Sequence, residues 1–333
     1  MSMPQIFAEQ YVKLPVLVNK NTCSGKTYIV TGSNNGLGLE TARHLVASSA
    51  ARVILAVRNT TAGEKAKIDI ERTTGRTGVA EVWHLDLASY VSVKKFAEKV
   101  RNELDRIDGM IENAGVFLNK WTVAEAMETS MTVNVVNTMF LAVLVMPKLI
   151  ESARRYGIQP RLVFLVSGLG FQAAAKHELD KGGRQNVLMG VNNSKKQDMN
   201  QRYALTKLIE IYAVRAMSEM FPVEKTNVAI NMVSPGICST GLARDASVFF
   251  RAAQGVIRTV LSRTAEQGSR TILHALLAEE DTHGKHLSGC KVKEHWVPCW
   301  MTNSDGQHMQ KQIWKELIAL METEYPGCTY NAI

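Results

Sequence analysis

The feature that most constrains this chain is a repeated alternation of short apolar runs with longer segments of helical periodicity. The runs are rich in β-branched residues and almost continuously apolar, which is typical of strands buried on both faces of a sheet. Strands that alternate with helices form parallel sheets. We therefore predict an α/β fold, a single doubly wound Rossmann-type parallel sheet with helices on both faces. The six runs are KTYIVT (26–31), RVILAV (52–57), EVWHLD (81–86), GMIENA (109–114), RLVFLVS (161–167) and NVAINMVS (227–234).

The alternation is not interrupted by a linker rich in proline, glycine or serine, so we predict one such domain over residues 23–333. Residues 1–22 have the character of an N-terminal arm. Residues 304–324 carry the pattern of a C-terminal helix.

Composition narrows the class of protein. The five cysteines are scattered without a CxxC pair and the histidines show no ligand spacing, so we predict no disulfide framework, no metal site and a reducing compartment. No secretory signal or membrane-length apolar run is visible, and we expect a cytoplasmic protein without a membrane span. The net charge of +8 is spread along the chain, which disfavours nucleic-acid binding.

A glycine-rich stretch, TGSNNGLG, follows the first apolar run and precedes the first helix. Its glycines, Gly32, Gly36 and Gly38, have the spacing G-x3-G-x-G. Glycines at this place let the backbone turn sharply and approach a pyrophosphate at the helix N-terminus. Tight turns also favour glycine, but the order strand, loop, helix indicates a dinucleotide site.

The second apolar run ends in an arginine. Folds specific for NAD usually carry an acid about 20 residues after the glycines to hold the ribose 2′-hydroxyl. Here Arg58 stands at that place, and a guanidinium can bind a 2′-phosphate through several N–H donors. The alternative is a solvated arginine at a strand end. We predict NADPH rather than NADH.

Tyr203 and Lys207 stand four residues apart, which places both side chains on one face of a helix. An ammonium close to a phenol lowers the pKa of that phenol toward working pH, as a general acid needs. The alternative is a core tyrosine followed by a solvated lysine. Ser167, which ends an apolar run 36 residues upstream, favours a proton-transfer pair.

These motifs, taken together and in this order, resemble those of the short-chain dehydrogenase/reductase family over almost all of residues 24–295. The chain is most similar to fungal secondary-metabolism members and to retinol-dehydrogenase-like reductases. The motifs are TGSNNGLG, HLDL with Asp86, ENAG with Asn113, then Asn134, Ser167, Tyr203-x3-Lys207 and SPGICST.

The resemblance implies a role for each catalytic residue. Tyr203 is the proton donor and Lys207 also holds the nicotinamide ribose. Ser167 binds the substrate carbonyl oxygen, unless VSGLG is merely a strand that ends in a turn. Asn134 anchors a water of the proton relay; the alternatives are a buried asparagine that bonds backbone, or Asn137 as the correct register.

The resemblance also implies a set of cofactor-binding residues, with Asp86 and Asn113 beside the adenine, Ile237 near the carboxamide, and Thr240 in contact with the cofactor. Glu112 departs from the family pattern, because an asparagine is common before Asn113. The full set is Gly32, Ser33, Asn34, Asn35, Gly36, Leu37, Gly38, Arg58, Asp86, Leu87, Asn113, Ala114, Gly115, Tyr203, Lys207, Pro235, Gly236, Ile237 and Thr240.

Two segments border the expected substrate pocket. Residues 171–202 are longer than the connection in many members, so we predict an active-site insertion there. Its apolar residues either meet an apolar substrate or pack the segment down; they are Phe171, Leu188, Met189 and Val191. Residues 240–263 correspond to the family's substrate lid, and their interspersed arginines leave contact with a membrane surface as the alternative.

The resulting prediction is an NADPH-dependent ketone or aldehyde reductase that acts on an apolar small molecule, such as a fungal polyketide or other secondary metabolite. It is expected as a monomer or a homodimer. Two alternatives remain: a non-redox dehydratase, epimerase or cyclase that uses the same pocket, and a regulator that senses NADPH without turnover.

Overall fold

The computed structural model describes residues 9–239, 241 and 262–329, and an eight-stranded sheet of order β10-β9-β8-β7-β4-β1-β2-β3 lies at its centre. All neighbouring strands from β3 to β9 pair in parallel. The doubly wound α/β prediction is confirmed. The six predicted runs form β1 (Thr27–Thr31), β2 (Arg52–Val57), β3 (Ala80–His84), β4 (Gly109–Glu112), β7 (Arg161–Leu165) and β8 (Ala229–Ser234).

Two further strands of this sheet were not predicted. β9 (His286–Ser288) pairs in parallel with β8, and β10 (Lys291–Val292) pairs antiparallel with β9. Segments this short contain no apolar run, so periodicity could not reveal them. A separate hairpin is formed by β5 (Val123–Ala124) and β6 (Met127–Glu128).

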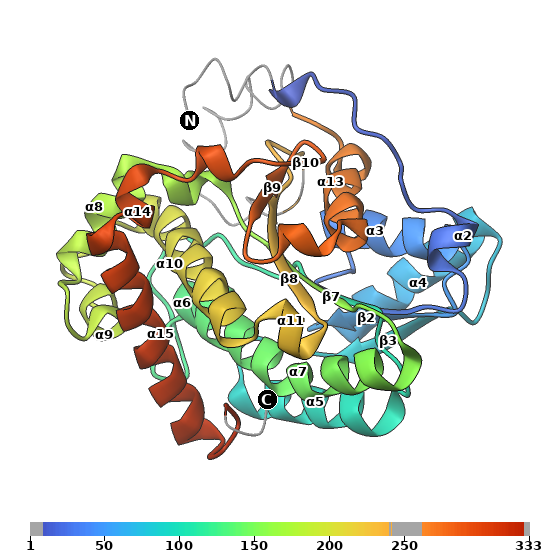
Figure 1. The fold of residues 1–333 in the computed structure, drawn as a ribbon, viewed down its shortest axis with the longest axis horizontal. Helices are drawn as coiled ribbons and strands as arrows, with labels where there is room; N and C mark the ends of the chain where they lie inside the picture. The colour runs from blue at the N-terminus through green and yellow to red at the C-terminus, as the bar shows by residue number, and fades with distance from the viewer. Residues whose placement is uncertain (1–8, 240, 242–261, 330–333) are drawn as a thin grey trace.

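Helices cover both faces of the sheet (Figure 1). One face carries α3 (Gly36–Ala47), α4 (Thr60–Thr74) and α13 (Ala265–Leu277). The other face carries α5 (Tyr90–Glu103), α7 (Asn137–Tyr156) and α10 (Met199–Met220), with α15 (Ser304–Glu324) packed outside α10. The remaining helical segments are α2 (Lys20–Cys23), α6 (Thr129–Met131), η1 (Thr132–Val136), η2 (Gly168–Phe171), α8 (Ala173–Lys181), α9 (Val187–Val191), α11 (Val223–Thr226), η4 (Glu280–Thr282), η5 (Glu294–Trp296) and α14 (Cys299–Thr302).

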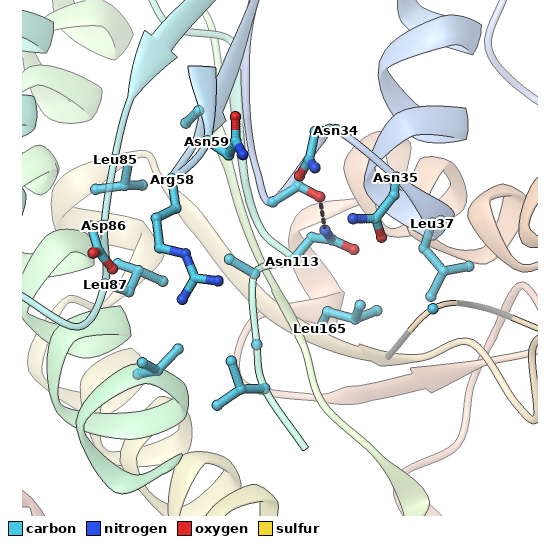
Figure 2. A pocket seen from close by; sticks show the side chains of 18 of the residues that line it. Asn34, Asn35, Leu37, Arg58, Asn59, Leu85, Asp86, Leu87, Asn113 and Leu165 are labelled. Carbon is cyan, nitrogen blue, oxygen red and sulfur yellow. Dashed lines mark hydrogen bonds between the residues drawn. The ribbon is translucent and has the colours of Figure 1, made fainter. Parts of the chain in front are cut away.

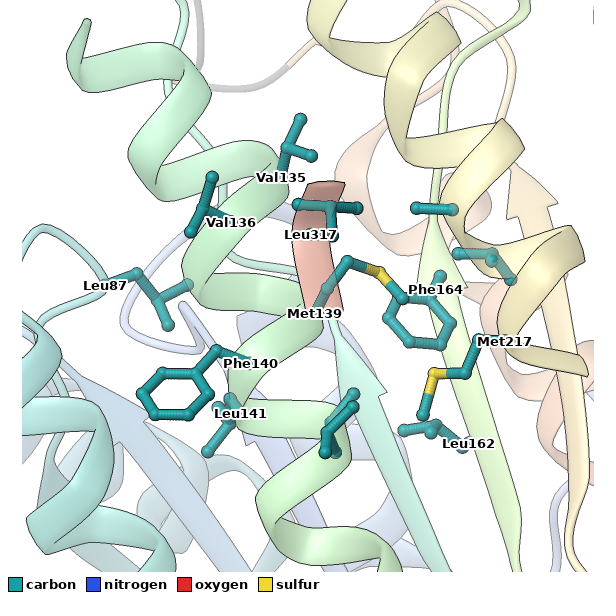
Figure 3. Close-up of a cluster of buried hydrophobic side chains, with 14 of the residues drawn as sticks. Leu87, Val135, Val136, Met139, Phe140, Leu141, Leu162, Phe164, Met217 and Leu317 are labelled. Atoms are coloured by element: carbon teal, nitrogen blue, oxygen red, sulfur yellow. The ribbon is translucent and has the colours of Figure 1, made fainter. Parts of the chain in front are cut away.

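The larger of the two hydrophobic cores lies between the sheet and the helices α5, α7 and α10. Figure 3 shows Met139 of α7 beside Phe164 of β7 and Met217 of α10, with Leu317 of α15 in the same cluster. One described helix, Thr129–Tyr156, is long and apolar enough to cross a membrane, but 89% of its most apolar window is buried inside the molecule. It is therefore a core helix of this domain.

The segments outside the alternating pattern also pack onto it. Leu14 and Val18 of the N-terminal arm are buried, and Arg270 Nη1 of α13 donates to the Leu14 carbonyl at 2.8 Å. α15 occupies the range for which the C-terminal helix was predicted. Of the predicted lid, residues 240 and 242–261 lie outside the described residues.

The predicted insertion at 171–202 contains η2 in part, α8 and α9. Phe171, Leu188 and Val191 are buried in the larger core, whereas Met189 is 65% exposed. The three buried residues therefore pack the segment onto the domain, which was one of the two alternatives; the other was contact with an apolar substrate.

Candidate active site

A cavity of about 360 Å³ opens at the carboxyl ends of β1 and β4. These strands are neighbours in the sheet, but the chain winds outward from β1 to β3 and then returns to β4 on the other side of β1. Open α/β sheets bind their ligands where the strand order reverses in this way. Gly32, directly after β1, and Asn113, directly after β4, both line the cavity.

The glycine loop forms one wall of this cavity, with Asn34, Asn35, Gly36 and Leu37 facing it. Gly36 begins α3 with a positive φ of 58°, a conformation that favours glycine. The side chain of the N-cap residue Asn35 makes no capping hydrogen bond. The first N–H groups of a helix have no intrahelical acceptor, so this end of α3 presents donors suited to a phosphate.

The last glycine of the motif has a different role. Gly38 does not line the cavity, and a Cβ built on it would lie 2.5 Å from Asn113 Nδ2. That amide donates to the carbonyls of Thr31 (2.8 Å) and Gly32 (3.3 Å). Gly38 therefore leaves the space in which Asn113 ties the end of β4 to the glycine loop. Ser33 is fully buried and does not line the cavity either.

Arg58, Asp86 and Leu87 line the wall opposite Asn35 and Leu37, with Asn113 between the two walls (Figure 2). Arg58 is exposed, and its guanidinium forms no ion pair within the parts of the chain that the structure describes. Asp86 Oδ1 accepts the Ala88 N–H at 2.9 Å, which fixes the loop after β3. This wall therefore offers a free guanidinium to a ligand. The predicted residues Ala114 and Gly115 also line the cavity.

The structure brings Ser167, Tyr203 and Lys207 together at the carboxyl end of β7. Ser167 follows β7, Tyr203 lies on α10, and the Ser167 side chain acts to lower the pKa of the Tyr203 phenol. Lys207 Nζ lies 5.9 Å from the centre of the Tyr203 ring, one helical turn on. Phe117, which lines the cavity, stacks against Tyr203 with 5.0 Å between ring centres. The phenol therefore adjoins the cavity through Phe117.

The pKa of Tyr203 is raised, whereas the sequence predicted that it would be lowered. Burial raises the pKa of Tyr203 above its usual value, while the Lys207 charge and the Ser167 hydrogen bond act to lower it. Glu210 also acts to raise it. The prediction that Lys207 brings the phenol pKa down was therefore incomplete, because burial and a nearby carboxylate outweigh the ammonium here.

Asn134 lies in η1, a π-helical turn, and such turns are frequent at functional sites. Its Oδ1 accepts the Val116 N–H at 2.8 Å, and its Nδ2 donates to the Val116 carbonyl (2.9 Å) and to Thr206 Oγ1 (3.1 Å). Asn134 thus joins the cavity wall to α10. Asn137, the alternative register, instead donates to the Leu87 carbonyl at 2.8 Å. The structure places Asn134 nearer to the Tyr203 helix.

The loop Pro235–Ile237 does not line the cavity. The Ile237 N–H donates to Gln10 Oε1 (3.1 Å), and Gln10 Nε2 donates to the Ile237 carbonyl (2.9 Å). Arg263 Nη1 donates to the Pro235 carbonyl at 3.1 Å. The N-terminal arm therefore holds this loop, a contact that the sequence did not indicate. Thr240 lies outside the described residues.

Glu112 and Glu210 carry two buried carboxyl groups, and neither residue was predicted as a site residue. Lys207 Nζ is 2.7 Å from Glu210 Oε2. Burial raises the pKa of Glu112 to about 8, and the charge of Glu210 adds to that effect. Burial raises the pKa of Glu210 to about 7 although Lys207 opposes it. The Lys-x2-Glu spacing on a helix was the available signal for Glu210.

The sheet topology and the polar lining of the cavity define a protein of the dinucleotide-binding α/β class, and comparison with known proteins identifies the family. The family model for short chain dehydrogenases matches residues 26–179. The described residues contain no cluster of three or more His, Cys, Asp or Glu side chains able to hold a metal ion.

Two curated relatives from fungi and one bacterial structure illustrate the similarity. The short chain dehydrogenase/reductase dmxR8 of Cryptosporiopsis sp. is 39% identical over 92% of this chain and 94% of its own. The short chain dehydrogenase atnD of Emericella nidulans is 39% identical over 86% of this chain and 90% of its own. A short chain dehydrogenase structure from Shigella flexneri, complexed with NADP, has a TM-score of 0.60 at 20% identity, covering 82% of this chain and 100% of that chain.

This chain belongs to the short-chain dehydrogenase/reductase family, whose members are oxidoreductases that bind a nicotinamide cofactor.

Proposed function

We infer that the protein is an NADPH-dependent reductase of ketones or aldehydes. The observation that carries this proposal is the position of Tyr203, which has Lys207 one helical turn away and packs against Phe117, a residue that lines the cavity. A phenol close to an ammonium is suited to give a proton to a carbonyl oxygen.

The residues around the cavity fit the cofactor. The N-terminal N–H groups of α3 would hold the pyrophosphate, and Asp86 and Asn113 would lie beside the adenine. The bound cofactor supplies the hydride. Arg58 at the end of β2 would bind a 2′-phosphate, which supports NADPH over NADH.

Tyr203 donates its phenolic proton to the carbonyl oxygen of the substrate, and Ser167 donates a hydrogen bond to the same oxygen. Lys207 stabilises the phenolate that remains, and it would hold the nicotinamide ribose of the bound cofactor. Asn134 links Val116 on the cavity wall to Thr206 on the helix that carries Tyr203, and so it helps to fix the position of that helix. The chain thus supplies orientation and the proton.

The substrate we propose is a largely apolar small molecule. Val116, Phe117, Val133 and Leu165 line the cavity, and Phe117 also packs against Tyr203. Apolar walls with a few polar groups are typical of small-molecule sites. Since the related proteins are fungal, a polyketide or another secondary metabolite is the class to test first.

The test is consumption of NADPH, followed by its absorbance, against carbonyl compounds that range from small aromatic ketones to bulky polyketides. We expect turnover, with a product that has gained two hydrogens. A product of unchanged mass would point to dehydratase, epimerase or cyclase chemistry. Tight NADPH binding without consumption across the whole panel would contradict the reductase and support a sensor.

A further inference from the structure

Glu112 and Glu210 are both buried on the side of the sheet that α10 covers, and the Glu210 charge acts on Glu112. Side chains alternate along β4, and Met110 belongs to the core shared with α7 and α10, so Glu112 points to that side as well. Glu210 lies on α10, three residues after Lys207. The two residues are 2% and 1% exposed. The end of β4 and the helix that carries Tyr203 and Lys207 thus place two carboxyl groups on the same side of the sheet.

Burial and a shortage of hydrogen-bond donors around Glu112 favour its neutral form. Thr31 Oγ1 accepts the N–H groups of Asn113 and Ala114, both at 3.0 Å. Its single proton is left for Glu112 Oε2 (3.2 Å) or the Ile111 carbonyl (3.3 Å). Glu112 Oε1 is buried without a partner among the described residues. An ionised carboxylate in this place would leave a charged oxygen unpaired, which is costly.

Glu210 has the opposite surroundings. Its Oε2 pairs with the Lys207 ammonium, whose Nζ also donates to the Leu165 carbonyl at 2.8 Å. A buried ammonium needs a charged partner of this kind. The geometry therefore suits a carboxylate at Glu210 and a carboxylic acid at Glu112.

We propose that Glu112 and Glu210 together hold one proton at neutral pH, and that this pair sets the charge balance around Lys207 and keeps Tyr203 protonated for carbonyl reduction. The role of Tyr203 in this statement rests on the function proposed above. Neither Glu112 nor Glu210 lines the cavity, so they act as positioning residues.

The charges that act on the cluster come from within it. Lys207 acts on Glu210, and Glu210 acts on Glu112. Tyr203 responds to both Lys207 and Glu210, which shift its pKa in opposite directions. β1 and β7, the strands on either side of β4, contribute the Thr31 hydroxyl and the Leu165 carbonyl. The charge state of Glu210 is therefore linked to that of Glu112.

The first test is the pH profile of kcat for reduction in Glu210→Gln. Removing the carboxylate lowers the pKa of Tyr203, so the limb on which the proton donor is lost moves to lower pH. Glu151→Gln is a matched control, because Lys148 and Glu151 form the same i,i+3 pair on α7 at 2.9 Å. We expect the control to keep the wild-type profile. A Glu210→Gln limb that is unchanged or moved to higher pH would overturn the proposal.

The second test does not depend on turnover. The folded-state pKa of Glu112 is raised above its ordinary value of 4.5, to about 8. Folding therefore takes up a proton, and the stability contributed by this group is full below about 4.5 and lost as pH rises toward about 8. Across this window the wild-type folding constant should fall by up to about tenfold per pH unit relative to Glu112→Gln.

Tyr203→Phe should show the same dependence of folding stability on pH as the wild type. This readout needs no turnover, so it can still be measured if the protein reduces no carbonyl and the proposed function fails. If Glu112→Gln does not fold, the infrared C=O stretch of a buried carboxylic acid in the wild type at neutral pH takes its place. A band that disappears as pH rises through the window supports the pair. A constant stability difference between wild type and Glu112→Gln, or a wild type without the band, would overturn it.

Discussion

The side-chain amide of Asn113 occupies the space that a Cβ on Gly38 would need, with 2.5 Å between them. Asn113 uses this position to hold the carbonyls of Thr31 and Gly32, and so it fixes the glycine loop against the end of β4. The last glycine of the motif thus acts through the packing of a neighbouring strand end and not through direct approach to a ligand.

Gly38→Ala should displace Asn113 and lower both stability and cofactor affinity. Overpacking of this kind costs about 1–3 kcal/mol, which exceeds the gain in helix propensity of up to about 1 kcal/mol. Chemical denaturation and NADPH titration measure the two effects. Gly63→Ala is a control, because its Cβ would meet Val57 and Val82 side chains at 2.7 Å without touching Asn113. Equal losses of NADPH affinity in both variants would argue against the role of Asn113.

Arg58→Ala should weaken NADPH far more than NADH. A hydrogen bond to a charged group contributes about 1.5–3 kcal/mol, so we expect NADPH binding to fall by about 10- to 100-fold, with NADH nearly unchanged. Isothermal titration with both cofactors measures the difference. Arg72→Ala, an exposed arginine on α4, should leave both affinities as they are. An equal effect of Arg58→Ala on the two cofactors would remove Arg58 from the 2′-phosphate.

Asn134 and Asn137, one turn apart, should separate in their kinetics. Asn134→Ala breaks the link between Val116 and Thr206, so kcat should fall by about tenfold or more while NADPH affinity stays close to wild type. Asn137→Ala releases the Leu87 carbonyl on the cavity wall, so it should weaken NADPH and spare kcat at saturation. Steady-state kinetics and cofactor titration on both variants measure these effects. The reverse pattern would assign the role of the family's catalytic asparagine to Asn137.

The parts of the fold that could be predicted are those with a strong local sequence pattern. Strands such as RVILAV (52–57) coincide with β2 because a continuous apolar run leaves few other structures. The three residues of β9 belong to the sheet only because β8 offers them a partner, and no local pattern records that.

In the candidate site too, features set by local spacing could be predicted and contacts between distant segments could not. The i,i+4 spacing placed Tyr203 and Lys207 on one helical face, since this depends on the helix alone. The proximity of Glu112 and Glu210 depends on how β4 faces α10, and the contact of Gln10 with Ile237 depends on the path of the arm. Such contacts join residues about one hundred or more positions apart, and sequence spacing cannot reveal them.

The most direct measurement of the central claim compares wild type with Tyr203→Phe for NADPH binding and NADPH consumption on the same carbonyl substrate. Because the phenol is the proton donor, kcat should fall by about 10²- to 10⁴-fold while NADPH affinity is retained. Tyr212→Phe removes a hydroxyl from a buried tyrosine on the same helix and should keep wild-type turnover. Full activity in Tyr203→Phe would contradict the account.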